Sequence, residues 1–354
     1  MRSFTHEGPA QRIVFGIDTI ATVSTELHRL NVTKAVVLST PGHRQLAGRV
    51  ADLLGERAVG QFHGAVPHTP IEVTEQALEF LRNRRGDAVV SIGGGSTTGL
   101  GKAVASRLGI QHLAIPTTYA GSELTPVLGE TAGGEKTTRS GPELMPNTVI
   151  YDIQLTATLP WSVTVPSAIN AMAHAVEALY SPDANDHTDV MALQAVRSID
   201  QGLHALHDDR HSLDACSELL YGAYLAGSCL GAVPMGLHHK LCHVLGGTFT
   251  LPHAPTHAVV LPYVMAYNEP VVLGVMSRIA EALDSDHAPR AVQFLIRDLG
   301  GPTALRDIGF TRADIGRAAE LAVSRPYPNP RDVTLDGVTH LLQQAFDGTP
   351  VPPM

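Results

Sequence analysis

The sequence predicts two domains: an N-terminal α/β domain built on a parallel sheet, residues 1–155, and an all-helical C-terminal domain, residues 156–354. Two observations lead to this prediction. Before residue 155, short runs rich in β-branched residues alternate with segments of helical periodicity, which is typical of a parallel sheet with helices on both faces. After residue 155, apolar residues recur at helical spacing and strand-like runs are scarce.

Each expected strand of the first domain is a short apolar run that stops at a turn residue. The run AVVLS precedes a Thr-Pro-Gly turn, and the run AVVSI continues into three glycines. Glycine and proline end regular structure because of their unusual backbone preferences. The expected strands are residues 12–15, 35–39, 88–92, 112–115 and 148–151. The expected helices between them are residues 21–30, 45–54, 72–84 and 99–108.

The second domain contains a series of segments whose apolar residues repeat every three to four positions, as on one face of a helix. The expected helices are residues 167–180, 188–206, 212–231, 236–245, 257–268, 289–299, 311–323 and 334–346.

The composition excludes several classes of protein. The 25 basic and 34 acidic side chains give a net charge of −9, which argues against a nucleic-acid partner. No segment approaches the roughly 20 apolar residues of a membrane helix, and the first residues lack the layout of a secretory signal. The 3 cysteines include no CxxC pair, so neither a disulfide framework nor a thiolate metal site is indicated. We therefore expect a cytoplasmic globular protein without a membrane partner.

Two loops that follow expected strands are rich in glycine and hydroxyl residues. The first contains Gly93, Gly94, Gly95, Ser96 and Thr97, and the second contains Thr117, Thr118 and Ser122. Glycines let backbone N–H groups approach a ligand closely, and a helix N-terminus favours a phosphate. The first loop matches neither of the two common phosphate-binding patterns, and a tight turn is the alternative interpretation. Two such loops at neighbouring strand ends favour a dinucleotide site.

Histidines are concentrated in the second domain. Asn170 and His174 lie four residues apart and share a helix face, as do His239 and His243. His253 follows after a Gly-Gly turn. A single histidine in such a place is more often structural than reactive, but this combination favours an active site.

Two ligands suit these histidines. His174, His239 and His253 supply three imidazoles, which can hold zinc. No carboxylate accompanies them, because position 170 is asparagine, and the absence of an anionic ligand weakens ferrous iron most. Lys240 would repel a cation if it pointed inward, whereas inward-facing histidines and a lysine suit an anionic substrate. A solvated helix face is the alternative interpretation for Lys240.

A rigid segment with three prolines, RPYPNPR, lies near the end of the chain and includes Tyr327. Because proline fixes the backbone, this segment can hold Tyr327 at the edge of a ligand site, although a connector between two helices is the simpler interpretation.

Taken together, these motifs resemble the iron-containing alcohol dehydrogenase superfamily over nearly the whole chain. The shared segments are SIGGGSTTGLGKA, IPTTYAGSE, the helix with Asn170 and His174, GLHHKLCHVLGGTF, LPHAPTH and PYPNPR. Within the superfamily, GLHHKLCH followed by LPH is similar to the maleylacetate reductases. The resemblance implies a dehydroquinate synthase-like fold, with a Rossmann-like nucleotide domain before a helical substrate domain, and a homodimer.

The sequence departs from the superfamily at three positions. The superfamily's metal ligands, an aspartate and three histidines, fall on Asn170, His174, His239 and His253. Asn170 therefore replaces the aspartate, and we expect no metal. Gly99 stands where an aspartate is common, and Ser39 ends the second strand where an acid often binds the adenosine ribose. Without that acid the 2′-phosphate of NADPH meets no repulsion, so we expect either NADH or NADPH as cofactor.

The resemblance implies reduction of the carbon–carbon double bond of maleylacetate, a small dicarboxylate, to 3-oxoadipate in aromatic-compound catabolism. Our hypothesis is that His243 or His253 polarises the ketone and that one of them, or Tyr327, delivers the proton. The expected carboxylate-binding residues are Asn170, His174, His239 and Lys240. The expected cofactor-binding residues are Ser39, Gly93, Gly94, Gly95, Ser96, Thr97, Thr117, Thr118 and Ser122.

Three other functions compete with this one. A metal-dependent alcohol or polyol dehydrogenase would hold zinc or iron on His174, His239 and His253. A lyase or cyclase similar to dehydroquinate synthase would need a carboxylate on its metal and more basic residues for phosphate. A non-catalytic binding protein would leave the converging histidine, lysine and tyrosine side chains without a role.

Overall fold

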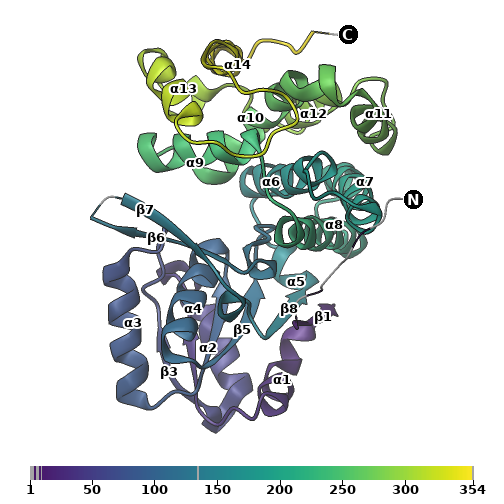
Figure 1. Cartoon of the computed structure of the whole chain (residues 1–354). Coiled ribbons are helices and arrows are strands. Elements are labelled where there is room, and N and C mark those ends of the chain that lie inside the picture. The colour runs from purple at the N-terminus through teal and green to yellow at the C-terminus, as the bar shows by residue number, and fades with distance from the viewer. Residues whose placement is uncertain (1–3, 5–7, 9, 134, 353–354) are drawn as a thin grey trace. The chain divides into compact units, whose positions relative to one another are not determined.

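The computed structural model describes residues 4, 8, 10–133 and 135–352. The chain forms two compact units that divide between Leu159 and Pro160, and each is described here by itself (Figure 1). The N-terminal unit contains a parallel sheet and the C-terminal unit is helical, so the predicted fold class is confirmed.

The sheet of the N-terminal unit has six strands in the order β1-β8-β5-β4-β2-β3, and all its pairings are parallel. Its strands are β1 (Arg12–Gly16), β2 (Ala35–Leu38), β3 (Ala58–Phe62), β4 (Ala88–Gly93), β5 (Gln111–Pro116) and β8 (Thr148–Asp152). The sequence analysis missed β3. This edge strand is half-buried along its whole length and carries a glycine, so it lacks the apolar run of a central strand.

Helices cover both faces of the sheet. In β2, Ala35 and Val37 point into a core formed with α1 (Val23–Arg29) and α2 (Arg44–Leu54). The alternate residues Val36 and Leu38 point into a second core, formed with α3 (Ile71–Arg84) and α4 (Gly95–Leu108). This alternation explains why both faces of the strand are apolar.

Several boundaries in this unit differ from the prediction. Helix α4 begins at Gly95 rather than at residue 99, because the glycines and hydroxyl residues of the first loop already form its first turn. An antiparallel hairpin of β6 (Val127–Ala132) and β7 (Glu135–Ser140) was not predicted, since its sequence is mostly polar. A short helix, α5 (Ile153–Thr156), follows the last strand.

The C-terminal unit is helical throughout its described residues. Its helices are α6 (Trp161–Leu179), α7 (Asp186–Asp208), α8 (Leu213–Ala232), α9 (Leu237–Phe249), α10 (His253–Asn268), α11 (Leu273–Ala282), α12 (Ala288–Asp298), α13 (Ile315–Val323) and α14 (Leu335–Asp347). Helix α6 begins at Trp161, six residues before the predicted start, and contains Pro166. Helix α10 begins at His253 rather than at residue 257. The third residue of this helix is a proline, which is tolerated in a first turn. The prediction omitted α11.

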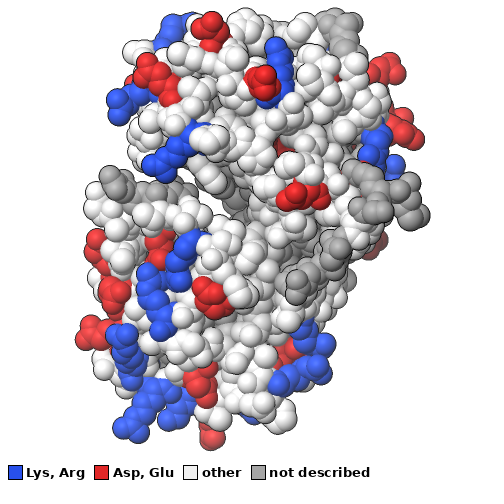
Figure 2. Space-filling view, viewed as in Figure 1, with Lys and Arg blue, Asp and Glu red and all other residues white. Residues whose placement is uncertain are grey.

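Acidic and basic side chains lie interspersed on the face of each unit that Figure 2 shows. On the hairpin, for example, Glu130 forms ion pairs with Arg107, at 2.9 Å, and with Arg139, at 3.8 Å. Among the described residues, no single helix has the length and hydropathy to cross a membrane. Only α8 and α9 taken together, as a pair bent by 96°, reach those values.

Candidate active site

The predicted cofactor-binding residues lie at the carboxyl ends of three neighbouring strands. Strand β4 pairs in parallel with β2 on one side and with β5 on the other. Ser39 follows β2, Gly93 ends β4, and Thr117 follows β5. Gly93 and Pro116 are partners in the register, so the two hydroxyl-rich loops leave the sheet at the same level. This edge of a parallel sheet is where nucleotides bind in open α/β folds.

The two loops contact each other so closely that side chains on the glycines would not fit. Gly93 has φ of +148°, and a Cβ there would lie 2.5 Å from Thr97 Oγ1. A Cβ on Gly94 would lie 3.1 Å from Thr118 Oγ1. The Thr117 N–H donates to the Gly93 carbonyl at 3.0 Å. Because these glycines have no side chains, the two loops pack together as one shell that is lined by backbone and hydroxyl groups.

This shell fits a nicotinamide dinucleotide. The hydroxyls of Thr97, Thr117 and Ser122 are buried and have no hydrogen-bond partner among the described residues. Gly95 and Ser96 begin α4, and the glycine before them has no side chain that could cap their N–H groups. Buried donors without partners, at a helix N-terminus, are suited to phosphate oxygens.

Lys102, about two turns further along α4, supports the second loop from within. Its ammonium group is buried and donates to the carbonyls of Ser122 at 2.5 Å, Thr125 at 2.6 Å and Val127 at 2.9 Å. Burial lowers the pKa of Lys102 to about 7, while the nearby Glu123 carboxyl opposes this shift. The lysine therefore supports the loop and does not point toward a phosphate.

Two of the positions that depart from the superfamily pattern have clear local structures. Ser39 is buried, and its Oγ lies 2.7 Å from His63 Nδ1. Burial lowers the pKa of His63, and the charge of Arg44 adds to this effect. At the other position, a Cβ on Gly99 would lie 2.6 Å from Thr69 Oγ1, so Thr69 fills the space that a side chain at position 99 would need.

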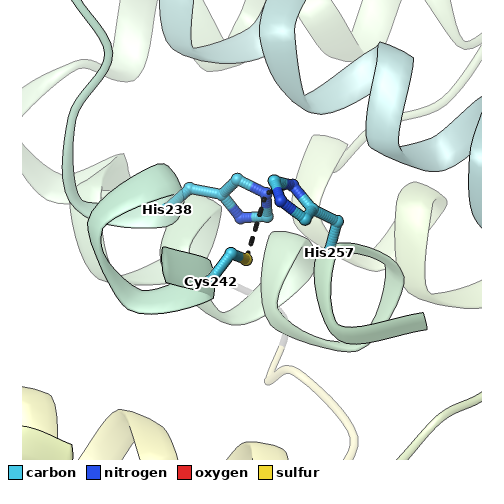
Figure 3. Close-up of side chains that lie close together, drawn as sticks. All are labelled: His238, Cys242 and His257. Carbon is cyan, nitrogen blue, oxygen red and sulfur yellow. Dashed lines mark hydrogen bonds between the residues drawn. The ribbon is translucent and has the colours of Figure 1, made fainter. Parts of the chain in front are cut away.

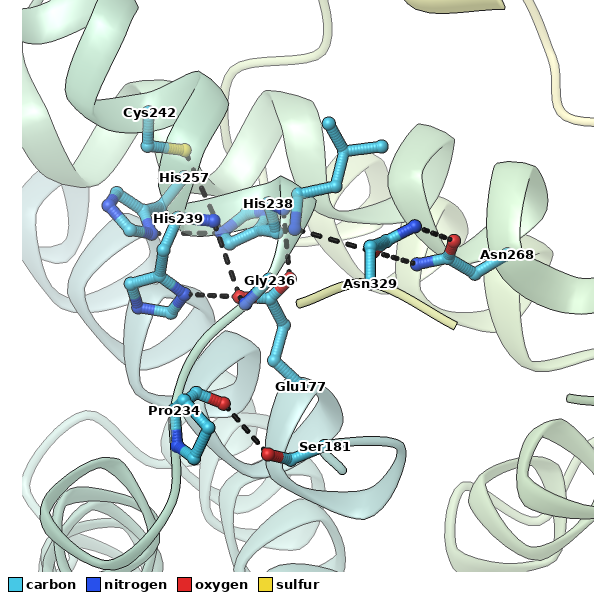
Figure 4. A network of polar contacts seen from close by, with 11 residues as sticks. Glu177, Ser181, Pro234, Gly236, His238, His239, Cys242, His257, Asn268 and Asn329 are labelled. Carbon is cyan, nitrogen blue, oxygen red and sulfur yellow. Dashed lines mark hydrogen bonds and ion pairs between the residues drawn. The ribbon is translucent and has the colours of Figure 1, made fainter. Parts of the chain in front are cut away.

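In the C-terminal unit, the centre of the candidate site is the buried carboxylate of Glu177 on α6 (Figure 4). It accepts hydrogen bonds from the backbone N–H groups of Gly236 at 3.0 Å, His238 at 2.9 Å and His239 at 3.3 Å. It also lies 2.6 Å from His239 Nδ1. The sequence spacing gave no sign of this carboxylate, which lies within hydrogen-bond distance of the His239 ring although the two residues are 62 positions apart in the sequence.

His239 lies at the centre of a group of imidazole rings. The centroid of its ring is 5.1 Å from that of His174, 5.3 Å from His238, 5.2 Å from His257 and 6.3 Å from His243. The structure thus brings together residues from α6, α9 and α10.

Several buried polar atoms of this group and its neighbour Asn170 have no partner among the described residues. Burial lowers the pKa of His174 well below its usual value, and the charges of His239 and His253 lower it further. Asn170 Oδ1, His174 Nδ1 and His239 Nε2 are buried without a hydrogen-bond partner among the described residues. Because buried polar atoms are normally paired, these atoms are candidates for contact with a ligand.

The other predicted residues lie toward the surface. His243 on α9 and His253 at the start of α10 are exposed, and the side chain of Lys240 is half-buried. The Lys240 ammonium lies 5.9 Å from the centre of the Tyr327 ring. The Tyr327 hydroxyl is buried without a partner among the described residues, and burial, together with the charge of Glu177, raises its pKa.

The proline-rich segment that carries Tyr327 is more than a connector, because it is tied to α9 and α10. The side-chain amides of Asn329 and Asn268 exchange two hydrogen bonds, at 2.8 and 3.2 Å. Arg331 donates to the Tyr267 carbonyl at 2.6 Å. A Cβ on Gly236 would lie 3.0 Å from the Pro328 carbonyl, so only glycine fits between the segment and Glu177.

Two of the histidines around His239 also belong to a set of possible metal ligands with a cysteine. His238, Cys242 and His257 offer ligand atoms that all lie within 4.8 Å of one another (Figure 3). His238 Nε2 and His257 Nδ1 are 2.9 Å apart, a hydrogen-bond distance, whereas two nitrogens on one tetrahedral zinc ion lie about 3.4 Å apart. Burial raises the pKa of the Cys242 thiol well above its usual value. We interpret this group as a hydrogen-bonded part of the core.

The two units together have the architecture of an oxidoreductase with a nucleotide-binding sheet and a helical unit that carries an imidazole group. The family model for the iron-containing alcohol dehydrogenases matches residues 10–153, and the model for the C-terminal part of the Fe-containing alcohol dehydrogenase family matches residues 164–346. The chain belongs to this family, as its motifs predicted, and its cofactor is a nicotinamide dinucleotide.

Relatives cover the whole chain. Maleylacetate reductase 1 of Rhodococcus opacus is 50% identical, over 99% of this chain and 98% of its own. Maleylacetate reductase of Burkholderia cepacia is 47% identical, over 98% of this chain and 99% of its own. The crystal structure of maleylacetate reductase from Agrobacterium tumefaciens is 44% identical, with a TM-score of 0.95, and covers 99% of this chain and 100% of that one.

The name of the family implies a bound metal. The side chains that could act as ligands decide which metal ion would fit this chain. The predicted donors are the imidazoles of His174, His239 and His253 and the amide oxygen of Asn170, and burial favours the neutral form of His174. Three imidazoles fit zinc, but this set lacks the anionic oxygen that favours a hard ion such as ferrous iron. Glu177 does not contribute that oxygen, since it is bonded to the far side of His239.

Proposed function

We propose that this protein reduces the carbon–carbon double bond of maleylacetate to give 3-oxoadipate, with NADH or NADPH as reductant. Near-complete relatives at 41–50% identity carry the name maleylacetate reductase. The observation that carries the proposal is the group of buried polar atoms without partners among the described residues, on Asn170, His174 and His239, together with Lys240 on the same helix as His239. Such a surface suits a substrate with two negative charges.

In this reaction the protein must bind the cofactor, stabilise an enolate of the substrate and supply a proton. The reduced nicotinamide supplies a hydride to the alkene carbon β to the ketone. The bond electrons then move toward the ketone oxygen, giving an enolate that the protein must stabilise, and the neighbouring carbon must receive a proton. We assign cofactor binding to the loops of residues 93–97 and 117–122, with Ser39 at the adenosine end, where the absence of an acid admits the 2′-phosphate of NADPH.

We assign binding of the two carboxylates to Asn170, His174, His239 and Lys240. Lys240 supplies a positive charge, the buried Asn170 amide supplies N–H donors, and burial favours the neutral form of His174. A charge-assisted hydrogen bond contributes about 1.5–3 kcal/mol, so two or three of them are enough to orient a dianion.

We assign the enolate and the proton to the outer residues. His243 or His253 polarises the ketone, and one of them, or Tyr327, delivers the proton. Exposure of the two histidines allows them to regain a proton from water after each turnover. Tyr327 holds its proton firmly because its pKa is raised, so it can donate only to a strong base such as an enolate.

The test is a single-turnover measurement of NADH oxidation with maleylacetate, comparing the native protein with His243→Ala. We expect a loss of about 10²–10⁴-fold if His243 polarises the ketone or delivers the proton. An unchanged rate removes His243 from the mechanism. Failure of the native protein to oxidise NADH with maleylacetate, while it does so with a simple ketone or aldehyde, rejects the proposed substrate.

The second candidate function is a metal-dependent alcohol or polyol dehydrogenase. The observation in its favour is the pair of Glu177 and His239, because histidines that bind metals usually donate their other N–H to a carboxylate. A metal on His174, His239 and His253 would polarise a carbonyl or alcohol oxygen. We propose instead that no metal is needed. Full activity after exhaustive dialysis against chelator, with no metal found by elemental analysis, supports this, and activity that returns only with added zinc or iron contradicts it.

A further inference from the structure

Glu177 has a combination of contacts that the proposed reaction does not yet use. Its side chain is completely buried, and four N–H donors surround its two oxygens. Two of the donors are backbone N–H groups in the first turn of α9, the third is the N–H of the residue before the helix, and the fourth is the ring of His239. The preceding residue, Gly236, has no side chain to cap this helix, so the cap comes from α6.

The contact at 2.6 Å determines which nitrogen of His239 carries hydrogen. A carboxylate can only accept hydrogen bonds, so Nδ1 must be the protonated nitrogen. Nε2 is then the only nitrogen that His239 can offer to a ligand, and it is buried without a partner among the described residues. The backbone N–H of His239 donates to the same oxygen at 3.3 Å, so both ends of the residue are held by one group.

We propose that Glu177 is a positioning residue: it holds His239 in the tautomer with hydrogen on Nδ1 and turns Nε2 toward the substrate. Its role in turnover rests on the proposed function, whereas the tautomer does not. In a catalytic triad, the third residue fixes the tautomer and the ring orientation of the histidine. Glu177 has the same two effects on His239.

The surroundings of Glu177 support this assignment over that of a simple helix cap. An ordinary cap uses the side chain of the N-cap residue and needs one oxygen, as Ser212 shows at the start of α8, where it accepts from the Ala215 N–H at 3.2 Å. Here one buried carboxylate also holds the ring of His239. Burying a charge is unfavourable unless its hydrogen bonds are satisfied, and the ring of His239 supplies one of the four that satisfy it.

The tautomer is tested directly by ¹⁵N NMR on protein labelled at histidine, with the His239 signals identified by their loss in His239→Gln. We expect hydrogen on Nδ1 and none on Nε2 in the free protein. Hydrogen on Nε2 alone would overturn the proposal. This measurement needs no substrate, so its outcome is independent of whether maleylacetate is the substrate.

The role in turnover is tested with Glu177→Gln, which keeps the shape but can no longer accept at both oxygens. Ser212→Ala is the control, because it removes the cap of α8 without touching His239. We expect both variants to unfold at a lower temperature and to bind NADH normally, while Glu177→Gln alone loses 10-fold or more in kcat/KM. Equal kcat/KM in the two variants would show that Glu177 is only a cap. If Glu177→Gln does not fold, the NMR measurement on the native protein still decides the tautomer.

Discussion

Replacement of Gly93 by alanine tests whether the glycine loop is shaped for a nucleotide. The backbone of Gly93 has φ of +148°, a conformation that residues with a Cβ rarely adopt. The new methyl group would lie 2.5 Å from Thr97 Oγ1 and 3.2 Å from Thr97 Cβ. Since both atoms belong to the first turn of α4, the turn must shift or Thr97 must rotate away.

The structure allows the effect to be estimated. The strained backbone costs about 1–3 kcal/mol of folding free energy. The displaced turn loses one hydrogen bond to the bound cofactor, worth about 1.5–3 kcal/mol when the acceptor is charged, which corresponds to a roughly 10- to 150-fold rise in the Kd for NADH. The Gly93 carbonyl also holds the second loop through Thr117, so both loops are affected.

The matched control is Gly109→Ala at the other end of α4. Gly109 also has a positive φ, +63°, but a Cβ there meets nothing within 4 Å. Urea denaturation gives the stability of both variants, and quenching or enhancement of NADH fluorescence gives the Kd. We expect both variants to lose stability and only Gly93→Ala to lose affinity for NADH. Equal NADH affinity in the two variants would refute the assignment of this loop to the cofactor.

Three further predictions concern other parts of the molecule. Because the pKa of Lys102 is about 7 in the folded protein and 10.5 in its reference state, the unfolded chain binds more protons between these values, and the stability rises with pH by about 1 kcal/mol per unit. Lys102→Met should remove this slope from urea titrations at pH 7.5 and 8.5, and an unchanged slope would contradict the shift. Gly99→Ala should cost about 1–3 kcal/mol through the contact with Thr69, and adding Thr69→Gly should restore most of it; equal urea midpoints for the single and double variants would exclude that contact. Tyr327→Phe should leave the unfolding free energy unchanged or raise it by about 1 kcal/mol, because the buried hydroxyl has no partner among the described residues, and an unchanged kcat would exclude Tyr327 as the proton donor.

Much of the fold follows from simple sequence patterns. The central strands β2, β4 and β8 are fully buried, so their sequences are almost continuously apolar and easily recognised. The edge strand β3 and the hairpin of β6 and β7 have solvent on one side or both, which leaves no such pattern. The helix starts at Trp161 and His253 were missed for a different reason, because prolines within the first two turns look like boundaries.

The candidate site could be predicted only in part. The spacing of Asn170 and His174, and of His239 and His243, places each pair on one helix face, and these residues do lie together. Glu177 was missed because its partner His239 is 62 positions away, and no periodicity connects two helices. One feature pointed to it: it is the only charged residue in α6, a helix whose other residues near it are fully buried. A lone charge in such a helix must have a buried partner.

The carboxylate of Glu177 also limits how this protein can change over evolutionary time. The same group sets the first turn of α9 and the orientation of His239, so a mutation there alters foldability and chemistry at once. Lineages that acquire new substrates are expected to vary Lys240 and His243 instead, because these residues lie on the same helix but beyond the N–H groups that bond to Glu177. Specificity can then drift while the scaffold beneath it stays unchanged.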